Sequence, residues 1–110
     1  MNDNLNETEY HRLADAMLDR LLAALEEADG QGALEVESQG GVLTIEVPPA
    51  KHYVVSKHVP TRQLWLSSPV SGGLHFDYNV ENKDWQLRNG QKLAATLFAE
   101  LQAAAGITLV

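Results

Sequence analysis

Acidic and histidine side chains recur at every fourth position near the start of the chain. The set comprises Glu7, His11, Asp15, Asp19 and, further along the same sector of a helix, Glu26. Side chains four residues apart on a helix have Cβ atoms about 6 Å apart, so adjacent pairs could share one hard cation. Carboxylate oxygen and imidazole nitrogen suit ferrous iron, manganese and related divalent ions. The alternative is a solvated acidic helix face that holds no ligand.

A smaller group of polar side chains lies in the second half of the chain. His75 and Asp77 are two residues apart, which puts them on one face of a strand, but two ligands make a poor metal site. Ser67 or Ser68 would complete the residue types of a Ser-His-Asp triad. Because no nucleophile elbow or Gly-rich oxyanion loop accompanies them, we do not expect nucleophilic catalysis. His52 and His58 have no other candidate ligand near them in the sequence. We therefore expect them to be structural or solvated.

Composition narrows the class of protein. The chain has 110 residues, of which 45% are hydrophobic, and it contains no cysteine, which excludes disulfides and thiolate metal sites. This length predicts one domain over residues 1–110. No apolar run approaches the roughly 20 residues that span a bilayer, and the polar start MNDNLNETEYH matches neither a secretory signal nor an Arg-rich transit peptide. We therefore expect a cytoplasmic protein with no membrane partner.

The charge of the protein is unevenly distributed. The net charge is −7, which argues against a nucleic-acid partner because phosphates require a basic surface. Residues 1–46 carry eleven acids against Arg12 and Arg20, a net charge of −9. Residues 47–110 carry four acids against six Lys and Arg, a net charge of +2. The excess of acid therefore belongs entirely to the first part of the chain.

Hydrophobic periodicity predicts a helix near each end of the chain. Residues 6–28 form one amphipathic helix that stops at the Asp-Gly pair of residues 29–30, and residues 91–105 form a second that stops at Gly106. The apolar tail at 107–110 is expected to dock on the core. The apolar stripe of the first helix is Tyr10, Leu13, Ala14, Met17, Leu18, Leu21, Ala24, Leu25 and Ala28.

Between the helices the sequence alternates as strands do. A hairpin turn is expected at 39–41 and another turn at Pro60. The order α-β-β-β-β-β-β-α predicts an α+β fold, a two-layer α/β sandwich with both helices on one face of an antiparallel sheet of about six strands. The predicted strands are 33–38, 42–47, 51–57, 62–68, 73–79 and 84–88.

The sheet face without helices, here called the open face, should meet solvent. Its predicted members are Glu35, Glu37, Thr44, Glu46, Gln63, Trp65, Ser67, His75 and Asp77. Trp65 is unexpected there, and exposed aromatics in polar surroundings commonly anchor protein interfaces. The alternatives are that a loop covers Trp65 or that a bulge turns it into the core. Trp85 shares a face with Leu87 and is expected in the core.

Three segments carry a resemblance to a known family. GGVLTIEV at 40–47, QLWLSSPVSGGLHFDY at 63–78 and DWQLRNG at 84–90, in this order of elements, resemble the frataxins, which include the bacterial CyaY-type members. The resemblance runs from EYHRLAD in the first helix to the last helix. It implies a small monomeric protein that binds iron, Fe²⁺ or Fe³⁺, and takes part in iron–sulfur cluster assembly. The implied partners are a cysteine desulfurase and a scaffold protein.

The resemblance also implies which residues act. We call the implied metal-binding surface the acidic ridge; it comprises His11, Asp15, Asp19, Glu26, Glu27, Asp29, Glu35 and Glu37. The implied partner-binding residues are Gln63, Trp65, Ser67, Lys57 and Glu46. The chain departs from the family pattern where relatives often carry ridge acids, at Leu22, Ala23, Gln31 and Ala33. It departs again beside Lys57, where Ser56 and His58 replace side-chain amides.

Two other functions remain open at this point. One is a ferroxidase that oxidises Fe²⁺ and stores it in iron-dependent oligomers. The other is a protein-interaction module whose acids only dock a basic partner. A ridge without an enclosing cage predicts weak and poorly selective binding, so other divalent cations are also candidate ligands.

Overall fold

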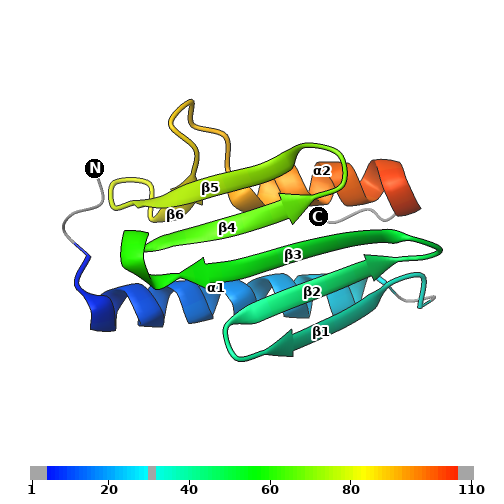
Figure 1. The fold of residues 1–110 in the computed structure, drawn as a ribbon, viewed down its shortest axis with the longest axis horizontal. Coiled ribbons are helices and arrows are strands. Elements are labelled where there is room, and N and C mark those ends of the chain that lie inside the picture. Colours follow the sequence, from blue (N-terminus) through cyan, green and yellow to red (C-terminus); the bar gives the residue numbers. More distant parts are fainter. Residues whose placement is uncertain (1–4, 30–31, 107–110) are drawn as a thin grey trace.

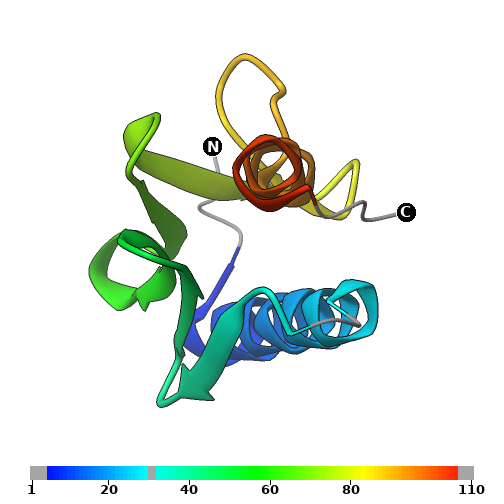
Figure 2. The same cartoon turned by 90° about the vertical axis from the view of Figure 1, so that its right-hand side faces the viewer.

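A computed structural model describes residues 5–29 and 32–106 of the chain. Two helices pack on one face of a six-stranded antiparallel sheet whose strand order follows the sequence, β1-β2-β3-β4-β5-β6. Figure 1 looks through the sheet onto the helices, and Figure 2 shows both helices on the same side of it. The predicted two-layer α+β sandwich is therefore confirmed. The elements are α1 (Glu7–Ala28), β1 (Glu35–Gln39), β2 (Val42–Val47), β3 (Lys51–His58), a 3-10 turn (Val59–Thr61), β4 (Gln63–Ser68), β5 (Gly72–Asn79), β6 (Asp84–Gln86) and α2 (Leu93–Ala105).

Helix α1 begins with a side-chain cap and ends with a backbone cap. The Asn6 side chain accepts the Glu9 N–H at 2.7 Å, which satisfies one free donor of the first turn. At the other end, the Asp29 N–H donates to the Leu25 carbonyl at 2.9 Å. Most of the predicted apolar stripe is buried, and its fully covered members are Tyr10, Ala14, Met17, Leu18, Leu21 and Leu25.

Strand ends differ from prediction by one or two residues, for identifiable reasons. Strand β1 starts at Glu35, two residues later than predicted, because the Ala33 and Leu34 N–H groups bond to the Asp29 carboxylate. Strand β6 ends at Gln86, because the Leu87 N–H instead closes the following turn to the Gln91 carbonyl. The predicted hairpin turn lies at 40–41, where both glycines adopt positive φ.

Helix α2 starts later than predicted, at Leu93, because Lys92 is extended and forms a bridge with Gln86. It ends at Ala105, and Gly106, the residue predicted to stop it, caps the helix in the left-handed conformation that glycine tolerates. The expected docking of the tail at 107–110 lies outside the described residues.

The core fills the space between the sheet and the two helices. Trp85 is 1% exposed, which confirms its predicted place. Its indole meets the rings of Tyr10 and Tyr78 edge-on, at centroid distances of 6.1 and 5.3 Å. These contacts tie α1 to the β5–β6 edge of the sheet and thereby hold the helix across the strands.

The strand register places every predicted open-face residue on one side of the sheet. Glu35 pairs with Glu46, and Gln63 pairs with Asp77. Trp65 pairs with Ser56 on β3 and His75 on β5. The pairing of β4 with both neighbours is continuous, so no bulge turns Trp65 toward the core.

Candidate functional site

The residues of the acidic ridge belong to α1, to the connection that follows it and to the edge strand β1, and Figure 1 shows where α1 and β1 lie in the fold. Strand β1 is the edge strand that contacts α1, and its acids Glu35 and Glu37 project from the open face of the sheet. Six ridge carboxylates are exposed: Asp15, Asp19, Glu26, Glu27, Glu35 and Glu37. The predicted residues of α1 and β1 thus share one edge of the molecule, although they are far apart in sequence.

One lysine enters the ridge at its amino-terminal end. The Lys57 Nζ lies 2.7 Å from Asp15 Oδ1 and 3.0 Å from His11 Nδ1. On the far side of the imidazole, His11 Nε2 lies 3.6 Å from a Glu7 oxygen. Because the Lys57 ammonium can only donate hydrogen bonds, His11 Nδ1 accepts the bond from Lys57. The imidazole proton is then on Nε2, which faces Glu7.

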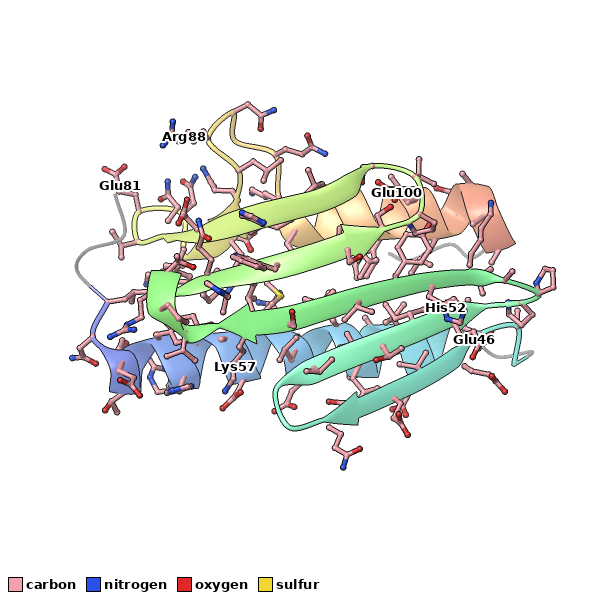
Figure 3. The ribbon with its side chains drawn as sticks, viewed as in Figure 1. Glu46, His52, Lys57, Glu81, Arg88 and Glu100 are labelled. Carbon is pink, nitrogen blue, oxygen red and sulfur yellow. The ribbon has the colours of Figure 1, made fainter. Side chains whose placement is uncertain are left out.

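Lys57 therefore does not lie with Trp65. The resemblance assigns it to the partner surface, but in strand β3 it alternates with Ser56 and His58, so its side chain leaves on the helix side of the sheet. Figure 3 shows Lys57 beside α1. Its side chain is 17% exposed, whereas that of Asp15 is 55% exposed.

Asp29 is occupied by backbone groups. Its Oδ1 accepts the Ala33 N–H at 2.7 Å, and its Oδ2 accepts the Leu34 N–H at 2.9 Å. These bonds close the connection from α1 to β1 and bring β1 alongside the helix. Asp29 thus shapes the ridge, and both of its carboxylate oxygens already have donors.

The ridge offers ligands in an open arrangement. Among residues 5–29 and 32–106, no three His, Asp or Glu side chains come close enough together to hold one ion. Hard divalent ions accept carboxylate oxygens together with water. An ion on this surface would therefore be held by one or two carboxylates and would keep several waters.

Trp65 lies between two imidazole rings on the open face. The His58 ring stacks on the indole at a centroid distance of 3.7 Å and an interplanar angle of 13°. The His75 ring covers the opposite side at 4.1 Å and 11°. His58 was expected to be structural or solvated, and its stacking on Trp65 is a structural contact that the sequence did not indicate. Trp65 is half-buried because side chains from β3 and β5, rather than a loop, cover the faces of its ring.

A hydrogen-bond chain fixes the edge of the indole. Trp65 Nε1 donates to Gln63 Oε1 at 2.8 Å, and Gln63 Nε2 donates to Asp77 Oδ1 at 3.1 Å. Asp77 Oδ1 is thereby engaged with Gln63, and the His75 ring is stacked on Trp65. This network makes a pre-organised surface of aromatic rings and amide groups.

Strand β4 is also hydrogen-bonded to α1. The Tyr10 hydroxyl donates to the Gln63 carbonyl at 2.8 Å, and Tyr10 itself is 0% exposed. Burial raises the pKa of Tyr10 to about 12, so the phenol stays protonated and keeps donating. The helix that carries the ridge is thus hydrogen-bonded to the residue that orients Trp65.

The other predicted partner-binding residues are Glu46 on β2 and Ser67 on β4. Glu46 on β2 pairs with His52 on β3, and Figure 3 shows them together near the far end of the sheet. Ser67 is exposed on β4 opposite Gly73. Its neighbour Ser68 points to the helix side and donates to Glu100 of α2 at 2.5 Å.

The sequence reasoning missed two contacts, the stacking of His58 and the inward direction of Lys57. Both follow from the pairing of β3 with β4, which sets Ser56 opposite Trp65 and Lys57 opposite the buried Leu64. Alternation along residues 51–58, with Tyr53 and Val55 in the core, would have indicated the direction of Lys57.

The fold and the ridge define a class of protein: a two-layer α+β domain with an acidic helix edge and an open sheet face. The sequence profile of the frataxin-like domain matches residues 3–107. The chain belongs to the frataxin family.

Relatives of this chain include both mitochondrial and bacterial proteins. It is 43% identical to the mitochondrial frataxin homolog of Saccharomyces cerevisiae over 105 residues, which cover 92% of this chain and 59% of that protein. It is 39% identical to the iron-sulfur cluster assembly protein CyaY of Vibrio cholerae over 72 residues, 66% of each chain. The chain thus spans about three fifths of the length of the yeast relative.

Solved structures show the same fold. The frataxin of Psychromonas ingrahamii, of the CyaY family, superposes with a TM-score of 0.83 at 25% identity and covers 96% of both chains. A trimeric frataxin from Saccharomyces cerevisiae, crystallised in complex with ferrous iron, superposes with a TM-score of 0.72 at 42% identity and covers 86% of both chains. Among the described residues, no helix is long and apolar enough to cross a membrane.

Proposed function

We propose that this protein binds iron weakly on the acidic ridge and takes part in iron–sulfur cluster assembly, where it regulates a cysteine desulfurase–scaffold complex or supplies iron to it. The observation that carries the proposal is the row of exposed carboxylates along α1 and β1 in a member of the frataxin family. The naming of the Vibrio cholerae relative as an iron-sulfur cluster assembly protein supports the pathway.

The arrangement of the ligands supports exchangeable binding. Oxygen ligands suit Fe²⁺ and Fe³⁺, and the ridge provides them singly or in pairs on a solvated edge. A metal that keeps most of its water can leave without unfolding any part of the protein, which suits delivery or sensing. The yeast frataxin complex with ferrous iron supports the choice of metal.

The open face supports the choice of partner. The stacked rings of His58, Trp65 and His75 form a rigid aromatic surface beside the amide of Gln63. Aromatic anchors held in one conformation lose little entropy on binding and are typical of interface hot spots. The negative ridge would attract a basic partner to the edge beside this surface.

An anaerobic Fe²⁺ titration followed by amide-resolved NMR tests the proposal. Paramagnetic broadening is expected first at ridge amides such as those of Glu26, Glu27 and Glu37. The double variant Glu26→Gln/Glu27→Gln should lose broadening there, whereas the control Glu81→Gln, an exposed acid on the β5–β6 turn, should not. Broadening spread evenly over the surface would contradict iron binding on the ridge.

The same protein should also bind the desulfurase. Trp65→Ala should weaken that binding without preventing folding, and iron should change desulfurase activity only when the ridge is intact. If iron has no effect on the complex, the interaction-module alternative is favoured. Rapid oxygen consumption on addition of Fe²⁺, followed by assembly into large oligomers, would favour the ferroxidase.

A further inference from the structure

The two ends of the acidic ridge differ in whether a lysine or arginine pairs with their acids. At the amino-terminal end, Lys57 pairs with Asp15 and His11, and Arg62 lies 4.0 Å from Glu7. The remaining exposed acids of the ridge form no ion pair with a cation of the described residues. These acids, here called the free acids, are Asp19, Glu26, Glu27, Glu35 and Glu37.

Lys57 is hydrogen-bonded to atoms that would otherwise be available to coordinate a metal. Its Nζ donates to Asp15 Oδ1 and to the Nδ1 lone pair of His11. His11 Nε2 carries a proton in this arrangement and offers no lone pair. A divalent ion could take His11 Nδ1 and Asp15 Oδ1 together only by displacing the ammonium from both.

The path of the side chain shows that Lys57 is held in place. A Cβ built on Gly41 would lie 2.8 Å from Lys57 Cε, so the lysine stem passes against the bare backbone of the β1–β2 turn. The Lys57 N–H also donates to the Gly41 carbonyl at 3.1 Å. A side chain that is 17% exposed and enclosed in this way has few other conformations to move to.

We propose that Lys57 is an internal cation that occupies the amino-terminal end of the ridge and directs metal to the free acids. The inference rests on the proposed iron-binding function and specifies where on the ridge metal binds. A positive charge about 3 Å from both ligands repels an incoming cation as well as blocking it. Metal therefore binds first between α1 and β1, toward the carboxyl-terminal end of α1.

The test compares three forms of the full chain: wild type, Lys57→Met and Lys51→Met. Methionine keeps an unbranched stem under the turn and removes the charge. Lys51 is the matched control, because it is an exposed lysine on the same strand without an ion pair in the described part of the chain. Lys57→Gln serves as a second variant if Lys57→Met does not give a folded amide spectrum.

The readout is broadening of assigned amides by Fe²⁺ under anaerobic conditions. In the wild type, the free acids should broaden before His11 and Asp15. In Lys57→Met, His11 and Asp15 should broaden at a metal concentration about tenfold lower than in the wild type, as expected from removing one nearby charge at a partly solvated site. Lys51→Met should match the wild type.

Two results would overturn the proposal. The first is wild-type broadening of His11 and Asp15 at the same concentration as the free acids; iron binding on the ridge would then stand while the role of Lys57 falls. The second is a Lys57→Met titration that matches that of Lys51→Met. If no form shows localised broadening, both the proposed function and this inference fail. Broadening at His11 and Asp15 in Lys57→Met alone would show that Lys57 blocks that pair, but it would overturn both metal binding by the native ridge and the claim that Lys57 directs metal to the free acids.

Discussion

Two buried tyrosines allow a direct test of the packing between α1 and the sheet. Tyr10 and Tyr53 are both 0% exposed. The Tyr10 hydroxyl donates to the Gln63 carbonyl at 2.8 Å, whereas the Tyr53 hydroxyl has no hydrogen-bond partner within the described residues. The same change, tyrosine to phenylalanine, should therefore lower stability at position 10 but not at position 53.

The magnitudes follow from the two environments. Tyr10→Phe removes a satisfied hydrogen bond and should lower the free energy of unfolding by about 1 kcal/mol. Tyr53→Phe removes a buried hydroxyl whose desolvation nothing offsets, so it should be neutral or should raise that free energy by about 1 kcal/mol. For a domain of this size, 1 kcal/mol corresponds to about 4 °C in Tm.

Urea unfolding at neutral pH, followed by circular dichroism, gives both values from the midpoint and the slope. The slope should stay constant, because neither change alters the surface exposed on unfolding. If Tyr53→Phe destabilises the protein as much as Tyr10→Phe, the tyrosines do not differ as the structure requires. A Tyr10→Phe variant as stable as the wild type would refute the argument that the Tyr10 bond holds β4 against α1.

The same tyrosine should shape the alkaline limit of stability. Burial raises the pKa of Tyr10 from 10.0 to about 12, so the fold favours the neutral phenol. Its contribution is fully present below pH 10 and is lost as the pH rises toward 12. Burial also raises the pKa of Tyr53, so Tyr10→Phe should reduce the decline without abolishing it. Unfolding midpoints measured between pH 9 and 12 check this; an unchanged slope of decline would contradict it.

Two further predictions concern the site residues. Trp65→Ala removes two ring stacks and should cost about 1–3 kcal/mol of stability while leaving the protein folded, which thermal unfolding measures. It should also lower the affinity for the desulfurase at least about tenfold, as measured by a binding isotherm. Unchanged affinity would exclude Trp65 from the interface. Asp29→Ala removes the acceptor of two backbone N–H groups and should lower the free energy of unfolding, measured in urea, by about 1–2 kcal/mol. The exposed control Glu27→Ala should change that free energy little. Equal losses of stability in the two variants would contradict a structural role for Asp29.

Local patterns in the sequence determined the elements and the layers. The apolar stripe of residues 10–28 and the alternation of residues 42–47 and 63–68 each require one covered face, and burial of these faces produces a helix layer on a sheet. Helix and strand periods are properties of neighbouring residues, so they can be read without knowing what packs on them. The core position of Trp85 and the predicted membership of the open face followed in the same way.

Contacts between elements were decided only by the tertiary structure. The sequence places His11 and Asp15 on one helix face, but it does not show that Lys57, 42 residues beyond Asp15, reaches them past a glycine turn. Nor does it show that two histidines from different strands enclose Trp65. These contacts depend on strand register and on the angle at which α1 crosses the sheet, and the whole core sets both. The residues of the ridge and of the open face could therefore be identified from the sequence. The side chains that contact them were determined by the packing of the folded chain.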